Sequence, residues 1–302
     1  MLFFYRDGLF IKKFRRNMKL LVTLNEILAD AKAKKYAVGL FNTVNLEMAK
    51  GVISAAEDMK SPVIIGTAEV LLPYASLEEL SYFLLPMAKK ATVPVVLHFD
   101  HGLTRNKINE AISLGFSSIM YDCSVKSFED NLAEVADMVK TARKAGISVE
   151  AELGHVGAND TGAAENVGEK DDSIYTQVAQ AKDFAERTNV DALAVAIGTA
   201  HGAYKSKPKL DIQRLKEISE AVKTPLVLHG GSGLSDDDFR SCIANGISKV
   251  NIFTDINCAA ALAAFQNYTE GSGMTDLINP IVKAVYEETI KKIKVFDSCG
   301  KY

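Results

Sequence analysis

What the sequence lacks already excludes several classes of protein. It contains no tryptophan, and only 7 prolines and 20 glycines occur among its 302 residues. With 48% hydrophobic and 24% charged residues, the composition is that of an ordinary soluble globular protein, which excludes disorder, collagen and coiled coil. A chain of this length buries roughly three quarters of the surface that it exposes when unfolded. We therefore expect a fold that needs neither disulfides nor a structural metal.

An excess of positive charge and a long apolar run are also missing. The sequence has 35 lysines and arginines against 38 aspartates and glutamates, a net charge of −3. Binding to a phosphate backbone requires the opposite balance, so a nucleic acid is not an expected partner. No apolar run reaches the ~20 residues of a membrane span, so a membrane is not an expected partner either.

The four cysteines are scattered and form no Cys-x-x-Cys pair, which favours neither a zinc ribbon nor a disulfide framework. This usage is typical of the reducing cytoplasm, which is the expected location. At the start of the chain, residues 1–4 are apolar and basic residues follow them, the reverse of the charge order in a signal peptide. We interpret residues 1–17 as an N-terminal extension, with Met18 a candidate for the native start.

Short runs rich in valine, isoleucine and leucine alternate with longer amphipathic segments along the chain. The eight expected strands are residues 37–42, 62–67, 93–100, 117–123, 148–154, 192–198, 225–231 and 249–254. The expected helices include residues 46–59, 77–89, 128–145, 177–188, 212–222, 236–245, 258–265 and 281–295. Eight β-α units in about 250 residues predict one closed (β/α)₈ TIM barrel spanning residues 18–302. The alternative is a doubly wound open sheet, but no G-x-G-x-x-G motif follows the first strand.

All five histidines are expected at or just beyond the carboxyl ends of strands, where barrels of this kind build their active sites. They are His98, His101, His155, His201 and His229. Three imidazoles from three strands can converge on one metal and leave a coordination position open, the pattern of a catalytic zinc site. The stretch 155–172 is irregular and rich in polar residues, and we expect a lid or a binding loop there.

Carboxylates lie next to these histidines in the sequence. Asp100 directly precedes His101, and the pleat places the two side chains on opposite faces unless the strand end bends. Asp122 ends the fourth strand, while Glu150 and Glu152 share one face of the fifth. We expect Asp122 and Glu152 to orient the ligands or to bind a second cation. For Glu150 we favour a structural role inside the barrel.

Glycine-rich strand ends after the seventh and eighth strands are typical of phosphate binding by backbone N–H groups and a helix N-terminus. The segments Gly230-Gly-Ser-Gly233 and Asn251-Ile-Phe-Thr254 occupy these positions, and Lys205 adds a positive charge. These features together describe a barrel that binds a metal and a phosphorylated small molecule.

Seven motifs in order resemble the class II, zinc-dependent ketose-bisphosphate aldolases, which include fructose- and tagatose-bisphosphate aldolases. The resemblance covers nearly all of residues 18–302. It rests on Ala37-Val-Gly-Leu-Phe-Asn-Thr-Val-Asn45-Leu-Glu, Val96-Leu-His-Phe-Asp-His-Gly102, Met120-Tyr-Asp122, Val149-Glu-Ala-Glu-Leu-Gly154, His201-Gly-Ala-Tyr-Lys205, Leu228-His-Gly-Gly-Ser-Gly233 and Lys249-Val-Asn-Ile-Phe-Thr254.

This resemblance implies a role for each matching residue. The catalytic zinc ligands would be His101, His201 and His229, and Asp100 would be the proton donor. Asp122 and Glu152 match a position for a second divalent cation, and a monovalent cation could also take part. The binding site for the dihydroxyacetone phosphate half of the substrate would comprise Gly202, Gly230, Gly231, Ser232, Asn251, Ile252, Phe253 and Thr254, with Asn45, Thr67 and Lys205 nearby. Family members are generally dimers or tetramers, so a homo-oligomer is expected.

The sequence departs from the family at three places. Phe253 stands where members that cleave fructose bisphosphate have asparagine or aspartate, and residues 157–160 read Gly-Ala-Asn-Asp instead of the usual Gly-Gly-Gln/Glu-Glu-Asp. No arginine lies near residues 279–284, where Lys283 is the nearest cation, so a substrate with one phosphate is an alternative to a bisphosphate.

Two other functions remain open from the sequence. A metal-dependent hydrolase on the same barrel would also use histidine and aspartate at strand ends, but it usually begins with a His-x-His pair that the first strand lacks. A non-catalytic sugar-phosphate-binding subunit is the other alternative, since a fold does not guarantee an activity. The presence of Asp100 and all three histidine ligands favours the aldolase.

Overall fold

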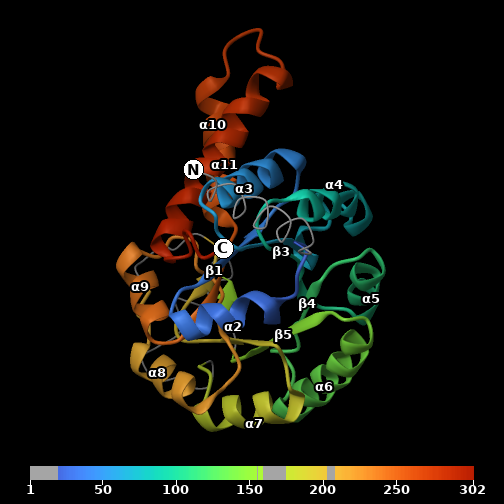
Figure 1. Ribbon diagram of the computed structural model, residues 1–302, viewed down its shortest axis with the longest axis vertical. Helices are drawn as coiled ribbons and strands as arrows, with labels where there is room; N and C mark the ends of the chain where they lie inside the picture. The colour runs from blue at the N-terminus through green and yellow to red at the C-terminus, as the bar shows by residue number, and fades with distance from the viewer. Residues whose placement is uncertain (1–19, 155, 159–174, 203–207) are drawn as a thin grey trace, which may run out of the picture.

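The computed structural model describes residues 20–154, 156–158, 175–202 and 208–302. Eight parallel strands form a closed barrel, and helices surround it (Figure 1). The strands follow one another around the barrel in the order β1-β10-β9-β7-β5-β4-β3-β2. Their bounds are β1 Val38–Asn42, β2 Val63–Ala68, β3 Val95–Gly102, β4 Ser118–Tyr121, β5 Ser148–Leu153, β7 Ala192–Val195, β9 Leu226–Leu228 and β10 Ile247–Ile252. The predicted TIM barrel and its eight strands are confirmed.

Helices pack around this barrel (Figure 1). They are α2 Leu24–Lys34, α3 Leu46–Asp58, the short 3₁₀ helix η1 Glu69–Leu71, α4 Leu77–Lys90, α5 Arg105–Ser113, α6 Phe128–Lys144, α7 Val178–Thr188, α8 Ile212–Ala221, α9 Asp236–Ala244, α10 Thr254–Asn267 and α11 Met274–Val295. α4 illustrates the local code, because Ser76 and Glu79 form a capping box at its start and Leu77, Leu80 and Leu84 are buried.

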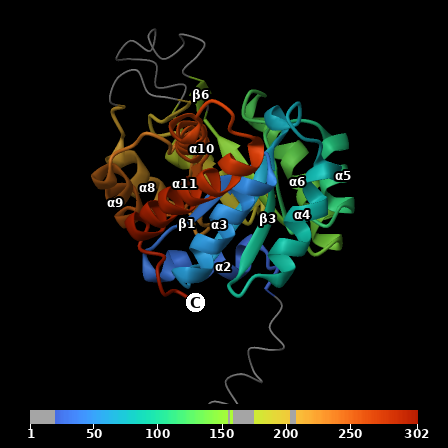
Figure 2. The ribbon, with the colours of Figure 1, turned by 90° about the horizontal axis from the view of Figure 1, so that it is seen from above.

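The interior of the barrel changes character from one end to the other. At the amino ends of the strands, α2 lies against the barrel, and its buried Leu24 and Leu28 belong to one cluster with Val38 and Val96 of the strands. Figure 2 shows α2 beneath the barrel, at the end opposite to β6. Because this end is filled by apolar side chains, the barrel has its opening for polar chemistry at the other end.

Two short strands lie beyond the carboxyl ends of the barrel strands. β6 (Gly157–Ala158) and β8 (Ala200–His201) pair in parallel as a separate two-stranded sheet, which the sequence analysis did not anticipate. This sheet brings the chain after β5 next to His201. Several predicted features lie outside the described residues: His155, residues 159–172 of the predicted loop, the extension 1–17 and Lys205.

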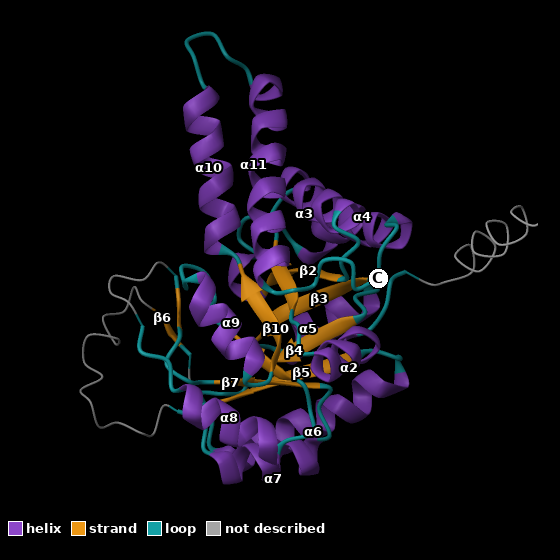
Figure 3. Cartoon of the chain, turned by 60° about the vertical axis from the view of Figure 1, so that its left-hand side comes forward, coloured by secondary structure: helices purple, strands orange, loops and turns teal. Residues whose placement is uncertain are grey.

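The last two helices project from the barrel as an arm (Figure 3). α10 and α11 pack against each other, and the base of α11 packs against α3. Both are longer than the predicted 258–265 and 281–295. α11 begins six residues before Pro280 and continues through it. A proline removes one helical hydrogen bond, and the packing of α11 outweighs that loss here. Among the described helices, none is both long and apolar enough to cross a membrane.

Candidate metal and substrate site

The end of β3 places two adjacent residues in one site. The register between β3 and β4 shifts after Phe99, and His101 adopts a left-handed backbone conformation with φ of 42°. Such a φ is uncommon for a residue other than glycine and bends the chain. The side chain of Asp100 is therefore buried inside the barrel while His101 also faces the site. The strand end bends, which was the stated condition for both residues to act together.

The three predicted histidine ligands converge at the carboxyl end of the barrel. Nε2 of His101 lies 2.9 Å from Nδ1 of His229, and the His201 ring lies 4.9 Å from the His101 ring, centroid to centroid. One ring nitrogen from each of the three residues lies within 4.8 Å of the others. Nitrogens that share a tetrahedral zinc at ~2.1 Å lie ~3.4 Å apart, so a small separation of the rings would admit the ion.

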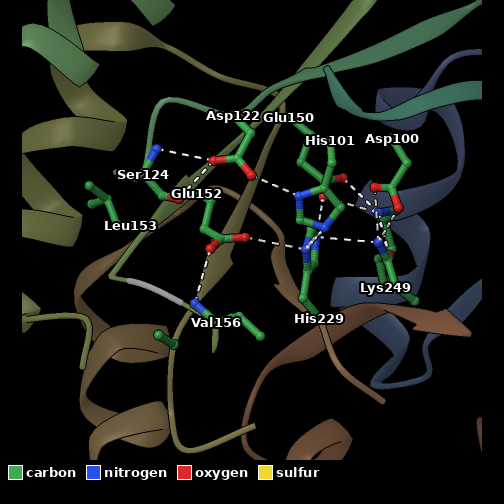
Figure 4. Close-up of polar contacts among 12 residues, drawn as sticks. Asp100, His101, Asp122, Ser124, Glu150, Glu152, Leu153, Val156, His229 and Lys249 are labelled. Atoms are coloured by element: carbon green, nitrogen blue, oxygen red, sulfur yellow. Dashed lines mark hydrogen bonds and ion pairs between the residues drawn. The ribbon is translucent and has the colours of Figure 1, made fainter. Parts of the chain in front are cut away.

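Two carboxylates lie beside these imidazoles, as Figure 4 shows. Oδ2 of Asp122 is 2.8 Å from Nδ1 of His101, while Ser124 donates to the other Asp122 oxygen through both its N–H and its hydroxyl. Oε2 of Glu152 lies 3.3 Å from Nδ1 of His229. Asp122 and Glu152 also form a group with His101 whose ligand atoms lie within 4.8 Å of one another. The structure thus brings the predicted carboxylates to the metal position.

The protonation equilibria of this cluster favour a cation among its members. Burial and the negative charge of Asp122 raise the pKa of Glu152 to about 8. Burial, together with the charges of His101 and His229, lowers the pKa of His201 to about 3, so this imidazole is neutral and able to coordinate. For His101, burial acts to lower the pKa, but the charges of Asp100 and its other carboxylate neighbours outweigh it and raise the pKa to about 9. A buried place where carboxylates attract positive charge fits a divalent metal ion.

The donor set agrees with zinc. Three imidazole nitrogens with an open side are typical of catalytic zinc, and the Asp122–His101 contact is the carboxylate–histidine arrangement that orients such ligands. A second group within reach of a metal, made of His98, Asp100 and Glu150, lies one layer deeper in the barrel. In that layer the ammonium of Lys249 already contacts Glu150, 2.8 Å from its Oε2. The residues therefore fit one zinc ion at the three histidines.

Asp100 is held by two amides. Nδ2 of Asn42, at the end of β1, donates to Oδ2 of Asp100 at 2.8 Å, and Nδ2 of Asn251 on β10 lies 3.0 and 3.1 Å from the two carboxylate oxygens. Burial acts to raise the pKa of Asp100, but the charge of His101 and the nearby ring of His98, whose Nε2 lies 3.7 Å from Oδ1, hold it well below its usual range. Asp100 is consequently a charged carboxylate whose orientation is fixed by two amides.

Two residues of this inner layer, Asn42 and Lys249, escaped the sequence analysis as site residues, and a third, His98, was named there only as one of five histidines at strand ends. Each is a polar residue inside an otherwise apolar strand, and the alternation Lys249-Val-Asn251 was the available signal. His98 is also a correction. It was expected at a strand end, but β3 continues to Gly102, so His98 is fully buried within the strand and bonds Oγ of Ser118 at 2.8 Å.

The predicted phosphate-binding residues surround one turn beside the histidines. Gly230 has φ of 64°, and a Cβ there would lie 2.5 Å from the carbonyl oxygen of Ala200, which precedes His201. Gly202 also has a positive φ. The hydroxyl of Ser232 accepts hydrogen bonds from the N–H groups of Phe253 and Asp255 at the start of α10. The remaining members of this set, which lie in the same segments, are Gly231, Ile252 and Thr254.

Three further predicted substrate residues differ in their surroundings. Thr67, on β2, is fully buried, and its hydroxyl has no hydrogen-bond partner among the described residues. The side chain of Asn45 caps α3 by accepting from the N–H of Met48 at 2.9 Å. Lys205 lies outside the described residues. Lys283, the cation nearest to residues 279–284 in the sequence, is 76% exposed and lies 3.8 Å from Glu287.

Comparison with known proteins identifies the family. The sequence model of the family described as "Fructose-bisphosphate aldolase class-II" matches residues 22–301. This chain belongs to the class II fructose-bisphosphate aldolase family. It is therefore a class II aldolase, a lyase that acts on a carbon–carbon bond. The family is zinc-dependent, and His101, His201 and His229 could bind the metal.

One relative of this aldolase has both a curated sequence and a solved structure. The chain is 44% identical to the uncharacterized protein YdjI of Escherichia coli K12, over 90% of this chain and 96% of that protein. The X-ray crystal structure of the YdjI aldolase superposes with a TM-score of 0.84, at 41% identity, and covers 93% of this chain and 99% of that one.

Two relatives carry the names of different reactions. A fructose-bisphosphate aldolase of Staphylococcus aureus (strain Mu50) is 36% identical over 93% of this chain and 99% of that protein. A 6-phospho-5-dehydro-2-deoxy-D-gluconate aldolase of Halalkalibacterium halodurans is 37% identical, over 93% of this chain and 98% of that protein. Because the two identities are nearly equal, similarity alone does not select a substrate for this chain.

Proposed function

We propose that this aldolase is zinc-dependent and reversibly cleaves a phosphorylated ketose to dihydroxyacetone phosphate and an aldehyde such as glyceraldehyde 3-phosphate. The ketose would be fructose 1,6-bisphosphate, tagatose 1,6-bisphosphate or a related compound. The observation that carries the proposal is the convergence of His101, His201 and His229, with the buried Asp100 next to His101 in the chain. A ketose whose carbonyl lies at the histidines would have its neighbouring hydroxyls within reach of this carboxylate.

His101, His201 and His229 would hold the zinc ion. When bound, zinc supplies a positive charge that stabilises the negative charge developing on the ketone half as the bond breaks. His101 would be kept in position by Asp122, since the carboxylate contacts the ring nitrogen that faces away from His229. Glu152 would balance the charge beside His229.

Asp100 would accept the proton of the C4 hydroxyl in the cleavage direction and return it in condensation. Its depressed pKa keeps the carboxylate charged, and Asn42 and Asn251 fix its orientation, so it is ready to accept. A base that is buried and held by two amides loses little entropy when the substrate arrives.

The phosphate of the dihydroxyacetone half would bind at the turn of Gly230, Gly231 and Ser232. This turn lies beside the first residues of α10, where the helix dipole favours an anion. Gly202 and Gly230 both have positive φ, which favours glycine, and at Gly230 the nearby carbonyl oxygen of Ala200 also leaves no room for a Cβ. Binding energy at this distance from the reacting carbons can position them.

Release of dihydroxyacetone phosphate from a panel of ketose mono- and bisphosphates tests the proposal. We expect at least one compound to be cleaved, a chelator to abolish the release, and zinc to restore it. The panel includes monophosphates because no arginine lies near Lys283 to bind a second phosphate. No release from any compound, by protein shown to contain zinc, would overturn the proposal.

We also infer that the chain forms a homo-dimer or homo-tetramer. The arm of α10 and α11 supports this, since Leu262, Phe265, Tyr268 and Met274 are large, apolar and exposed along it. Sedimentation velocity at micromolar concentration measures the assembly directly. A monomer under those conditions would contradict the inference.

A further inference from the structure

Lys249 is a fully buried lysine that reaches across the barrel interior. It lies on β10, and its side chain has no exposed surface. Its ammonium lies 2.8 and 3.0 Å from the two carboxylate oxygens of Glu150 on β5, and 2.6 Å from Oδ1 of Asn251 on its own strand. Strands β10 and β5 are separated by β9 and β7 in the barrel order, so this ion pair spans the interior.

The first branch from Lys249 leads to the metal position. Oε1 of Glu150, which contacts Lys249, also lies 2.8 Å from Nε2 of His229. The other nitrogen of the same ring, Nδ1, faces His101 at 2.9 Å. A carboxylate that accepts from Nε2 fixes the proton there and leaves Nδ1 as a lone-pair donor aimed at the metal. Figure 4 shows Lys249, Glu150 and His229 in this arrangement.

The second branch leads to the proton-transfer group. Lys249 contacts the amide oxygen of Asn251, which orients that amide so that its NH₂ group points to Asp100. Nδ2 of Asn251 then lies 3.0 and 3.1 Å from the two oxygens of Asp100. The amide is thus held at both ends, by Lys249 at its oxygen and by Asp100 at its NH₂ group, and loss of the lysine would leave only contacts at the NH₂ group to orient it.

We propose that Lys249 is a positioning residue that orients the metal ligand His229 through Glu150 and the proton acceptor Asp100 through Asn251. The inference rests on the proposed function, because it assigns to one lysine the alignment of both halves of that site. Lys249 contacts Glu150 and Asn251, and Glu150 contacts His229, so both act through the residues they contact.

A purely structural ion pair is the competing explanation. Replacing a buried ion pair by uncharged residues of similar volume is often neutral for stability, whereas removing one partner alone strands a buried charge. The variants follow from this difference. Lys249→Met by itself leaves Glu150 without its cation, and the double variant Glu150→Gln/Lys249→Met removes both charges while Gln keeps an acceptor for His229.

Zinc affinity and turnover of the full-length protein test the proposal. Zinc dissociation constants are measured by competition with a chromophoric chelator, and the cobalt-substituted protein gives a visible spectrum that reports ligand geometry. Groups behind a metal ligand typically change metal affinity ~10–100-fold. We expect the double variant to bind zinc at least ~10-fold more weakly, with an altered cobalt spectrum. At saturating zinc its kcat should fall at least ~10-fold with little change in KM, because orientation of Asp100 is lost.

Lys32→Met is the matched control. Lys32 is a partly buried lysine on α2, at the amino end of the barrel. Its ammonium donates to the carbonyl oxygens of Val222, Lys223 and Thr224, just after α8. Its loss removes comparable contacts without touching the site. We expect lower thermal stability with native zinc affinity and a native cobalt spectrum.

The outcomes separate this inference from the proposed function. A double variant that binds zinc and turns over within threefold of the native protein would overturn the role of Lys249. A native protein that binds zinc and cleaves no ketose would overturn the proposed reaction. Zinc titration needs no substrate, so the zinc affinity of the double variant would still test whether Lys249 orients His229 through Glu150. A native protein that binds no zinc would overturn both.

Discussion

The two ends of the barrel interior are built on opposite principles. At the amino end, Leu24 and Leu28 of α2 pack with apolar strand residues such as Val38, Val96 and Val227 in one cluster. From the middle of the barrel toward the carboxyl end, β3, β5 and β10 carry His98, Asp100, Glu150 and Lys249, all with at most 1% exposure. The change takes place within single strands, since Val96 and His98 are only two residues apart.

The difference teaches where stability and chemistry come from in this aldolase. Burial of apolar surface at one end and on the outer face of the strands stabilises the fold. This stabilisation offsets the free-energy cost of destabilising features elsewhere. The carboxyl end carries those features: buried charges, a histidine at positive φ and a carboxyl whose pKa rises to about 8. Changes at the two ends should therefore have separable effects.

The largest effect should follow from His229→Ala at the carboxyl end. The variant loses a ring that faces His101, Glu150 and Glu152, so we expect zinc affinity to fall more than about 100-fold, beyond what groups behind a ligand contribute. Activity should be lost at stoichiometric zinc. Metal content after dialysis and chelator competition measure the change, and native zinc content would remove His229 from the ligand set.

Asp100→Asn should separate proton transfer from metal binding. We expect kcat for cleavage to fall about 10²–10⁴-fold, the usual contribution of a positioned general base, while zinc content stays native. Exchange of solvent hydrogen into dihydroxyacetone phosphate needs no C4 hydroxyl, so it serves as an internal control that should persist. Cleavage at the native rate by metal-replete variant would contradict the role of Asp100.

Leu28→Ala, at the amino end, should lower stability and leave zinc binding intact. Leu28 is fully buried in the cluster beneath the barrel, and truncation of such a side chain typically costs about 2–5 kcal/mol of unfolding free energy. Denaturant titration measures the loss, which should leave zinc affinity unchanged.

Val125→Ala is the matched control for this truncation. Val125 is 80% exposed, so its loss should change unfolding free energy by no more than about 0.5 kcal/mol. A Leu28→Ala variant that loses zinc affinity without losing stability would show that the two ends are not separable.

The smallest effect concerns the reactivity of the thiols, which reports how closely the carboxyl end of the barrel is packed. Cys123 follows Asp122 but is buried, and Cys242 is buried with a pKa raised to about 12 by burial and the charge of Asp238. Cys258 and Cys299 are exposed. A disulfide reagent should modify two thiols per native chain and four after denaturation. Rapid modification of Cys123, read by peptide mass, would show an open path into the site.

The sequence predicted that His101, His201, His229 and Asp100 lie at strand ends, because such positions follow from local rules. Strand ends are marked by the switch from apolar runs to polar residues, and barrels gather those ends on one face. The bend at His101 could only be stated as a condition, because a single left-handed residue leaves no mark in the apolar pattern. Glu150 was rightly placed inside the barrel, although its partner was not foreseen.

The pairing of Lys249 with Glu150 illustrates what local rules omit. These residues are 99 positions apart, and Asn251 and Asp100 are 151 apart. A buried lysine in an apolar strand signals that a counter-charge exists, yet several carboxylates could supply it. Only closure of the barrel determines which of them lies opposite.

By itself, the sequence determined the β-α alternation, the closed barrel, the end of the barrel that carries the chemistry and the residue types that gather there. These follow from hydrophobic period and strand length, which are properties of short segments. The tertiary structure decided which side chains meet across the barrel, how the β3 end turns and how far the α10–α11 arm extends. Such contacts depend on the twist and register of strands far apart in the chain, and those are fixed only when all eight pack around one core.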